Sequence, residues 1–158
     1  MEQPFRRRRS GGALDLEFTP MPESKIIGSA PILLVEDVVA SANYYRDKVG
    51  FSYERFWGEP PCFCILWRDN FHIMLSQVEN PKVIIPHYKV VENLWNVYFW
   101  VDDADALYEE LKGRGATIDY ELCDQPYGCR EFGIQDLDGY DIAFGQDMDA
   151  PAGKDGRP

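Results

Sequence analysis

The sequence predicts an α+β fold in which two βαβββ repeats pair into an incomplete barrel around a cleft. A strand ending in acidic residues, a short helix and a glycine stop occur twice, over Val35–Phe51 and Val101–Ala116. Later in each copy a polar turn, Asp69-Asn70 or Asp138-Gly139, leads into an apolar strand. Such self-similarity indicates one supersecondary unit used twice, with the cleft where the copies meet.

Length and composition fit a single domain. The chain has 158 residues, of which 45% are hydrophobic, enough to bury one core. No apolar run approaches the roughly 18 residues of a membrane span. Arg6–Arg9 lead into Ser10-Gly11-Gly12 rather than into the apolar stretch of an export signal. We therefore expect a cytoplasmic protein with no membrane partner.

The formal net charge of -11 narrows the choice of partners. Residues 26–158 carry 11 basic and 23 acidic residues, so the acidity lies in the part expected to fold. A negative field repels nucleic acid and favours cationic small molecules, or simply solubility. We interpret Arg6–Arg9 as part of a solvated tail; a weak nucleic-acid or localisation signal is the alternative.

The chain divides into a folded centre and two tails. We expect a disordered N-terminal tail over residues 1–26 and a C-terminal tail over 147–158, because both are rich in proline, glycine and charge. The domain spans 27–146, with repeat one at 27–80 and repeat two at 93–146.

Each repeat is expected to have one helix and four strands. In the first, Asp37 caps the helix, Gly50 ends it, and Pro31 makes the opening strand an edge strand or a hinge. The expected strands of the first repeat are Ile27–Leu34, Ser52–Trp57, Phe63–Arg68 and Phe71–Gln77. In the second repeat we expect strands at Trp95–Val101, Thr117–Leu122, Cys129–Gln135 and Tyr140–Phe144, and a helix at Ala104–Lys112.

The four cysteines show no metal-binding spacing and are assigned no chemistry. Cys62 and Cys64 alternate on one face of an expected strand, where small buried residues are the simplest interpretation. Cys123 and Cys129 have no histidine cluster near them in the sequence.

Three stretches resemble the vicinal oxygen chelate superfamily, which includes glyoxalase I, extradiol dioxygenases and bleomycin-resistance proteins. They are Ile32–Phe51, Val97–Ala116 and the closing Arg130–Ile142. Within this group, Gln125-Pro126-Tyr127-Gly128 and Arg130-Glu131-Phe132 are similar to the Q-P-W-G-R-E-F stretch of bleomycin-resistance proteins, with Cys129 inserted. Ala30-Pro31-Ile32-Leu33 resembles their V-P-V-L opening, which implies a homodimer in which the first strand can be exchanged.

The resemblance also allows a test for a metal site. Metal-dependent relatives place histidine, glutamine or glutamate at positions that correspond here to Ala30, Met74, Asn96 and Ala143. These side chains do not form a ligand set for a divalent ion. We therefore expect no metal, no cofactor and no catalytic residues.

His72 and Asp141 form the alternative polar site. They occupy equivalent positions in the two repeats and could supply a displaced metal pair or an acid–base couple. A histidine paired with some other acid, or an exposed face carrying both side chains, is the competing interpretation.

The candidate ligand-binding residues are aromatic. By resemblance to the family's ligand contacts, they are Phe56, Phe63, Trp100 and Tyr127. Aromatic walls with carboxylates nearby suit a flat, cationic ligand through stacking and cation–π contacts. Eight aromatics lie on expected strands or at their ends, and half of them must face the other side of their strands and pack under the helices; the eight are Phe56, Trp57, Phe63, Trp67, Trp95, Tyr98, Trp100 and Tyr127.

These observations favour a homodimeric small-molecule-binding protein that sequesters a flat, cationic, glycopeptide-like compound and so confers antibiotic resistance. A glyoxalase- or isomerase-like lyase or oxidoreductase with an atypical metal site is the alternative. A related protein that binds a different ligand is the third possibility.

Overall fold

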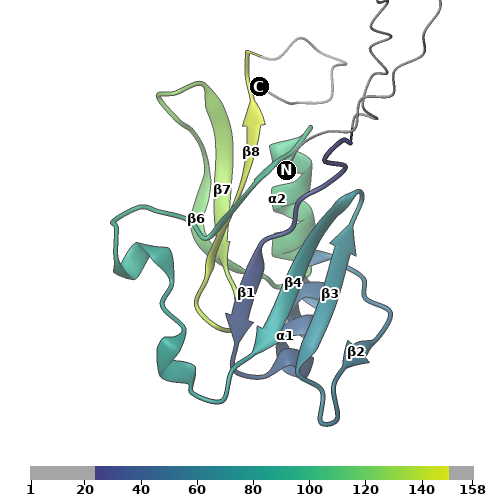
Figure 1. Ribbon diagram of the computed structural model, residues 1–158. Coiled ribbons are helices and arrows are strands. Elements are labelled where there is room, and N and C mark those ends of the chain that lie inside the picture. Colours follow the sequence, from purple (N-terminus) through teal and green to yellow (C-terminus); the bar gives the residue numbers. More distant parts are fainter. Residues whose placement is uncertain (1–23, 150–158) are drawn as a thin grey trace, which may run out of the picture.

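The computed structural model of the protein describes residues 24–149 (Figure 1). Most of both predicted tails, including Arg6–Arg9, lies outside these residues. In chain order the described elements are β1 (Ile32–Val35), α1 (Val38–Tyr44), a π-helical turn (Tyr45–Val49), β2 (Phe56–Trp57), β3 (Phe63–Arg68), β4 (Phe71–Gln77), 3-10 turns at Pro81–Val83 and His87–Lys89, β5 (Val97–Trp100), α2 (Ala104–Gly113), β6 (Thr117–Asp124), β7 (Cys129–Gln135) and β8 (Asp141–Asp147).

The strands form two open four-stranded sheets with the same order, β1-β4-β3-β2 and β5-β8-β7-β6. β1 pairs with β4 in parallel, as β5 does with β8, and the other neighbouring pairs are antiparallel. The register repeats as well, because Ile32 lies opposite Met74 in the first sheet and Tyr98 opposite Ala143 in the second. The predicted α+β class and the two βαβββ units are confirmed.

The two helices begin in the same way. Asp37 accepts hydrogen bonds from the backbone N–H groups at the start of α1, and Asp103 does so for α2. A glutamine from the closing strand of each unit accepts from the first helical N–H: Gln77 from Val38 at 2.9 Å, and Gln146 from Ala104 at 3.0 Å. Each helix start is therefore tied to the last strand of its own unit.

One face of each sheet is buried against the helices in a single core. Figure 1 shows α1 behind β3 and β4, and α2 between β8 and the first sheet. The core joins both units: the ring centroids of Tyr108 and Phe132 lie 5.3 Å apart within the second unit, and those of Phe51 and Phe99 lie 6.1 Å apart across the units. No α-helix of residues 24–149 covers the opposite face of either sheet, and we call this face the free face.

Each hairpin turn packs against the helical segment of the other unit. Asp136, at the β7–β8 turn, accepts a 2.7 Å hydrogen bond from the Tyr45 hydroxyl, and Asp138 accepts one from Ser41, also at 2.7 Å. Arg68, at the β3–β4 turn, donates to Glu110 of α2 at 2.8 Å. Contacts between the units are therefore reciprocal, with a buried acid on one side and an arginine on the other.

The largest differences between the predicted elements and the structure lie in the first unit. The opening strand starts at Ile32 rather than Ile27, because Ile26 and Ile27 are almost fully exposed and pair with no strand. Of the strand predicted at Ser52–Trp57 only the last two residues form β2, although Ser52 bridges Trp67. Cys62 precedes β3 and is exposed, whereas Cys64 is buried as predicted.

No helix among residues 24–149 combines the length and the apolar character needed to cross a membrane.

Candidate functional site on the free faces

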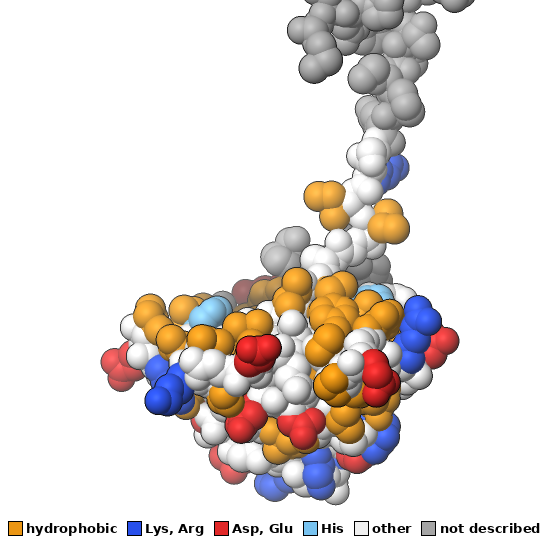
Figure 2. All heavy atoms as spheres, turned by 60° about the horizontal axis from the view of Figure 1, so that its bottom comes forward, with side chains coloured by type: hydrophobic (Ala, Val, Ile, Leu, Met, Phe, Trp, Pro, Cys, Tyr) orange, Lys and Arg blue, Asp and Glu red, His pale blue; other side chains and the backbone are white. Residues whose placement is uncertain are grey.

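The free face of the first sheet is apolar and open to solvent. Trp57 and Phe63 are register partners whose ring centroids lie 5.9 Å apart. On the edge strand, Ile32 is 61% exposed. Figure 2, which brings the lower end of Figure 1 forward, shows hydrophobic side chains grouped along the upper rim of the compact part of the molecule. The strand register also places Leu34, Ile65, Trp67, His72, Met74 and Ser76 on this face.

The free face of the second sheet is centred on a buried carboxylate. Glu131 of β7 has no exposed surface, although it is a charged residue in the middle of a strand. Its oxygens accept hydrogen bonds from three phenolic hydroxyls: Tyr98 at 2.8 Å, Tyr120 at 3.2 Å and Tyr127 at 2.6 Å. Three donors on two oxygens suit a carboxylate that only accepts.

Two strand glycines make this arrangement possible. A Cβ atom at Gly133 would overlap the Tyr120 ring, and one at Gly145 would overlap the Tyr98 hydroxyl. The rings can therefore lie close over β7 and β8, where side chains would otherwise stand. Burial, followed by the negative charge of Glu131, raises the pKa of Tyr98 and of Tyr120. These phenols stay protonated at neutral pH and serve as donors.

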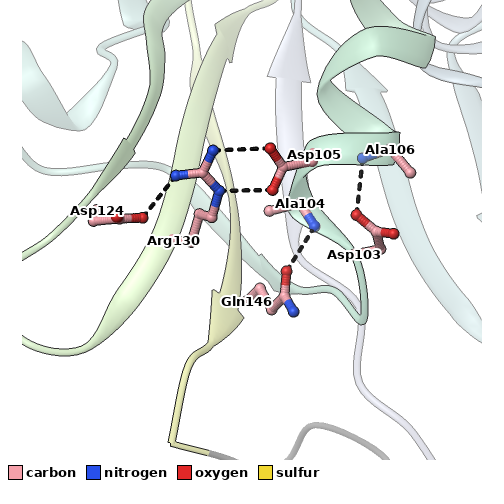
Figure 3. A network of polar contacts seen from close by, with 7 residues as sticks. All are labelled: Asp103, Ala104, Asp105, Ala106, Asp124, Arg130 and Gln146. Carbon is pink, nitrogen blue, oxygen red and sulfur yellow. Dashed lines mark hydrogen bonds and ion pairs between the residues drawn. The ribbon is translucent and has the colours of Figure 1, made fainter. Parts of the chain in front are cut away.

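Arg130, the residue before Glu131 in the sequence, forms its ion pairs with other acids (Figure 3). Arg130 alternates with Glu131 along β7, so it points to the opposite face. Its guanidinium forms a two-point ion pair with Asp105 of α2, at 2.6 and 2.8 Å, and a further bond to Asp124 at 2.7 Å. Arg130 therefore fixes α2 to β6 and β7 and leaves Glu131 to the tyrosines.

Three of the four predicted ligand-binding residues lie on or beside the free faces. Phe63 is half-buried on the first sheet, and Trp100 is 41% exposed on the second. Tyr127 lies in the loop between β6 and β7 with its hydroxyl directed to Glu131. Phe56 pairs with the buried Cys64 and therefore points to the core. The adjacent Trp57 takes the place on the free face.

The two residues of the alternative polar site, His72 and Asp141, do not contact each other through a hydrogen bond or an ion pair. His72 is exposed on β4, whereas Asp141 is buried on β8, in the other sheet. Asp141 accepts a 3.0 Å hydrogen bond from Gln135, and no hydrogen bond or ion pair links it to His72. Burial raises the pKa of Asp141. The two residues share a register position, as predicted, but they are not partners.

The positions that carry metal ligands in relatives do not form a metal site here. Met74 and Ala143 occupy equivalent register positions, and neither they nor Ala30 and Asn96 supply imidazole or carboxylate donors. Within residues 24–149 there is no group of three or more histidine, cysteine, aspartate or glutamate side chains that could hold an ion. The residues present do not fit the metal of the metal-dependent relatives.

A pocket of about 220 Å³ lies along the edge strand β1. Ile32 and Leu34 form one side, and Val83, Ile85 and His87 of the connector form the other. The His87 Nδ1 atom lies 2.9 Å from the Trp95 carbonyl oxygen, which can only accept, so this nitrogen carries the proton. The pocket lining is mixed, because His87, Asn96 and Tyr140 lie beside the aliphatic side chains.

Sequence reasoning missed Glu131 as a site residue and placed it only within a motif. A signal for it does exist in the chain. Along β7 the residues on the free face are Cys129, Glu131, Gly133 and Gln135, so the acid alternates with small residues. A glycine inside a strand indicates close approach by another group, which here is a tyrosine ring.

Comparisons with known proteins identify similar folds. A bleomycin-binding protein from the bleomycin-producing Streptomyces verticillus, complexed with copper(II)-bleomycin, matches with a TM-score of 0.59 and 27% identity, over 77% of this chain and 97% of that one. TioX from Micromonospora sp. ML1 matches with a TM-score of 0.61 and 20% identity, over 76% of this chain and 98% of that one.

A search of curated proteins finds no significant match. The family model of the Glyoxalase/Bleomycin resistance protein/Dioxygenase superfamily matches residues 27–144, which include every strand of both sheets up to the middle of β8. The strand order, the duplicated unit and this match together show that the chain belongs to the glyoxalase/bleomycin resistance/dioxygenase superfamily.

Proposed function

We propose that this protein binds a flat, cationic small molecule and holds it without chemical change, with bleomycin-type glycopeptides as the first candidate. The observation that carries the proposal is the pair of free faces, which present Phe63 on the first sheet, and Trp100 together with a buried acid, Glu131, on the second. Aromatic surfaces bind planar heterocycles by stacking, and carboxylates attract a positive group. Sequestration of this kind is the action of a resistance protein.

The charge of the chain supports the same class of ligand. A net charge of -11 raises the local concentration of cations and speeds their encounter with the protein. The solved relative that shares 27% identity is a bleomycin-binding protein, which makes this glycopeptide the natural first probe.

We also propose that the working form is a homodimer. In one chain both free faces leave apolar side chains in water, including Trp67 at 37% exposure and Trp100 at 41%. A second copy that places its second sheet opposite the first sheet of this chain would bury them and close a cleft between the faces. Analytical ultracentrifugation tests this directly, since a monomer at micromolar concentration would contradict it.

An enzyme with an atypical metal site receives less support. It would need donors that converge, and His72 and Asp141 lie on different sheets, with Asp141 hydrogen-bonded to Gln135. Mass spectrometry of the ligand recovered after prolonged incubation separates the two functions. An unchanged mass is expected for sequestration, and a changed mass would favour the enzyme.

Calorimetric titration with metal-free and copper-loaded bleomycin tests the proposed function. We expect saturable heat at micromolar protein concentration, and a loss of affinity of at least roughly tenfold in Phe63→Ala and Trp100→Ala. Phe56→Leu is the matched control, because Phe56 points to the core and its replacement should leave binding unchanged. Absence of saturable heat in the folded wild type would exclude bleomycin as the ligand.

A further inference from the structure

Glu131 is a buried negative charge without a cationic partner. It has no exposed surface, and the ion pairs of the described residues do not include it. The nearest arginine in sequence, Arg130, is bound to Asp105 and Asp124 on the opposite face of β7 (Figure 3). A buried charge is normally paired with an opposite charge, so three neutral phenols are an unusual environment for it.

The three tyrosines differ in how firmly they are held. Tyr98 and Tyr120 belong to strands, and their rings lie over Gly145 and Gly133, where no side chain competes for the space. Tyr127 belongs to the loop between β6 and β7, and 57% of it is exposed. Rotation of this one side chain into solvent would uncover the Oε1 atom of Glu131 without disturbing a strand.

The surroundings of this oxygen favour a cation. Trp95 and Trp100 flank Tyr98, with ring centroids 5.2 and 5.0 Å from it, so two indole rings lie next to a tyrosine that donates to the carboxylate. At the same end of the sheet, the Asp149 carboxylate lies beside Gly128, and Asp147 closes β8. Acid and aromatic rings together are the surroundings that bind alkylammonium groups.

We propose that Glu131 anchors an ammonium group of the ligand and that Tyr127 gates it, its hydroxyl occupying the anchor in the empty protein and yielding to the ligand's N–H donor. This inference rests on the proposed small-molecule function and deepens it by naming the group that is recognised. Tyr98 and Tyr120 keep the carboxylate oriented while the exchange takes place.

A pair of small probes of similar shape isolates the charge. Benzylamine is an ammonium ion at pH 7, whereas benzyl alcohol is neutral, and neither contains any other part of a glycopeptide. Binding is followed by tryptophan fluorescence, to which Trp95 and Trp100 contribute, and by chemical-shift changes in NMR spectra. We expect the wild type to bind benzylammonium at least roughly tenfold more tightly than the alcohol.

Two variants test whether Glu131 and Tyr127 cause the preference for benzylammonium over benzyl alcohol. Glu131→Gln should abolish the discrimination between the two probes, because the charge is lost while the shape is kept. Tyr127→Phe should tighten benzylammonium binding several-fold, because the hydroxyl that competes for Glu131 is removed. Tyr53→Phe is the matched control, since the Tyr53 hydroxyl donates to Asn43 and is remote from this cluster in the hydrogen-bond network.

Equal affinity for both probes in the wild type, no binding of either, or discrimination that persists in Glu131→Gln would overturn the proposal. If Glu131→Gln does not fold, Tyr127→Phe decides, because unchanged or weaker ammonium binding contradicts a gate. Failure here is distinct from failure of the proposed function. Bleomycin that binds wild type and Glu131→Gln equally well would remove only the anchor, whereas ammonium binding without bleomycin binding would remove only the glycopeptide.

Discussion

The two free faces share a backbone plan and carry opposite chemistry. By register, Phe63 of the first sheet corresponds to Glu131 of the second, and Ser76 corresponds to Gly145. The first face is apolar and partly exposed, whereas the centre of the second is covered by its own tyrosines. Duplication therefore supplied two equivalent surfaces, and substitution at a few positions made one apolar and the other a polar anchor.

The largest expected difference between the faces comes from removing the corresponding side chains. Glu131→Ala leaves the partly buried hydroxyls of Tyr98 and Tyr120 without their acceptor, so we expect a loss of about 3 kcal/mol in the free energy of unfolding. Phe63→Ala removes a half-buried ring and should cost about 1 to 2 kcal/mol. Urea denaturation measures both, and equal losses would contradict the assigned difference.

The next effect concerns pH and the turns that join the units. Burial is the main cause that raises the pKa of Asp136 from 3.8 to about 6. The folded protein then binds more protons than the unfolded chain between these values, so this group makes stability fall as pH rises through that window. The free energy of unfolding of Asp136→Asn should therefore rise by roughly 2 to 3 kcal/mol relative to that of the wild type as the pH goes from 4 to 7.

Asparagine preserves most of the Asp136 geometry, because one amide oxygen can still accept from the backbone N–H groups of Asp138 and Tyr140. The experiment is urea denaturation of both proteins at several pH values. A difference between them that stays constant from pH 4 to pH 7 would show that Asp136 titrates normally. Asp138→Asn, at the same turn, is the matched control because it is only partly buried.

A smaller effect is expected from filling the space that the tyrosines occupy. In Gly145→Ala the new methyl group collides with the Tyr98 hydroxyl, and we expect a loss of about 2 kcal/mol together with a change in tyrosine and tryptophan fluorescence. Ser76→Ala, at the corresponding position of the first sheet, should stay within about 0.5 kcal/mol. A neutral Gly145→Ala would mean that Tyr98 does not lie over β8 in solution.

The smallest expected effect is at the turn of the first unit. Arg68 donates to the Val49 carbonyl at 2.6 Å and to Glu110 at 2.8 Å, but its side chain is partly exposed. Arg68→Met should therefore cost about 1 kcal/mol, measured by urea denaturation at low and high salt. Arg114→Met removes only the more exposed pair with Glu110 and should cost less than half of that. Equal losses would contradict the docking role of Arg68.

Much of the fold followed from local patterns. The acidic cap Asp37 and the glycine at position 50 were predicted and are confirmed, because capping and left-handed backbone depend on residues near in sequence. β3 and β7 have the predicted bounds. The shortened first and second strands were less predictable, since pairing requires a partner strand and not only an apolar run.

The site was predictable only in part. Phe63 and Trp100 were placed by resemblance, and the structure puts them on the free faces. Phe56 could not be assigned to a face, because a shift of one residue reverses the side chain and β2 is too short to fix its register by pattern. The sequence did not identify Glu131 as the shared acceptor of three tyrosine hydroxyls, because these donors come from β5, β6 and a loop.

The sequence by itself determined the duplicated unit, the helix boundaries and the poor donor set at the positions where metal-dependent relatives hold their ion. Those features depend on neighbouring residues or on residue type alone. Tertiary structure decided which side of each strand is free, how the turns of one unit dock on the helical segments of the other, and that three tyrosines converge on Glu131. These depend on strand register and on the packing of segments remote in sequence, which no local pattern encodes.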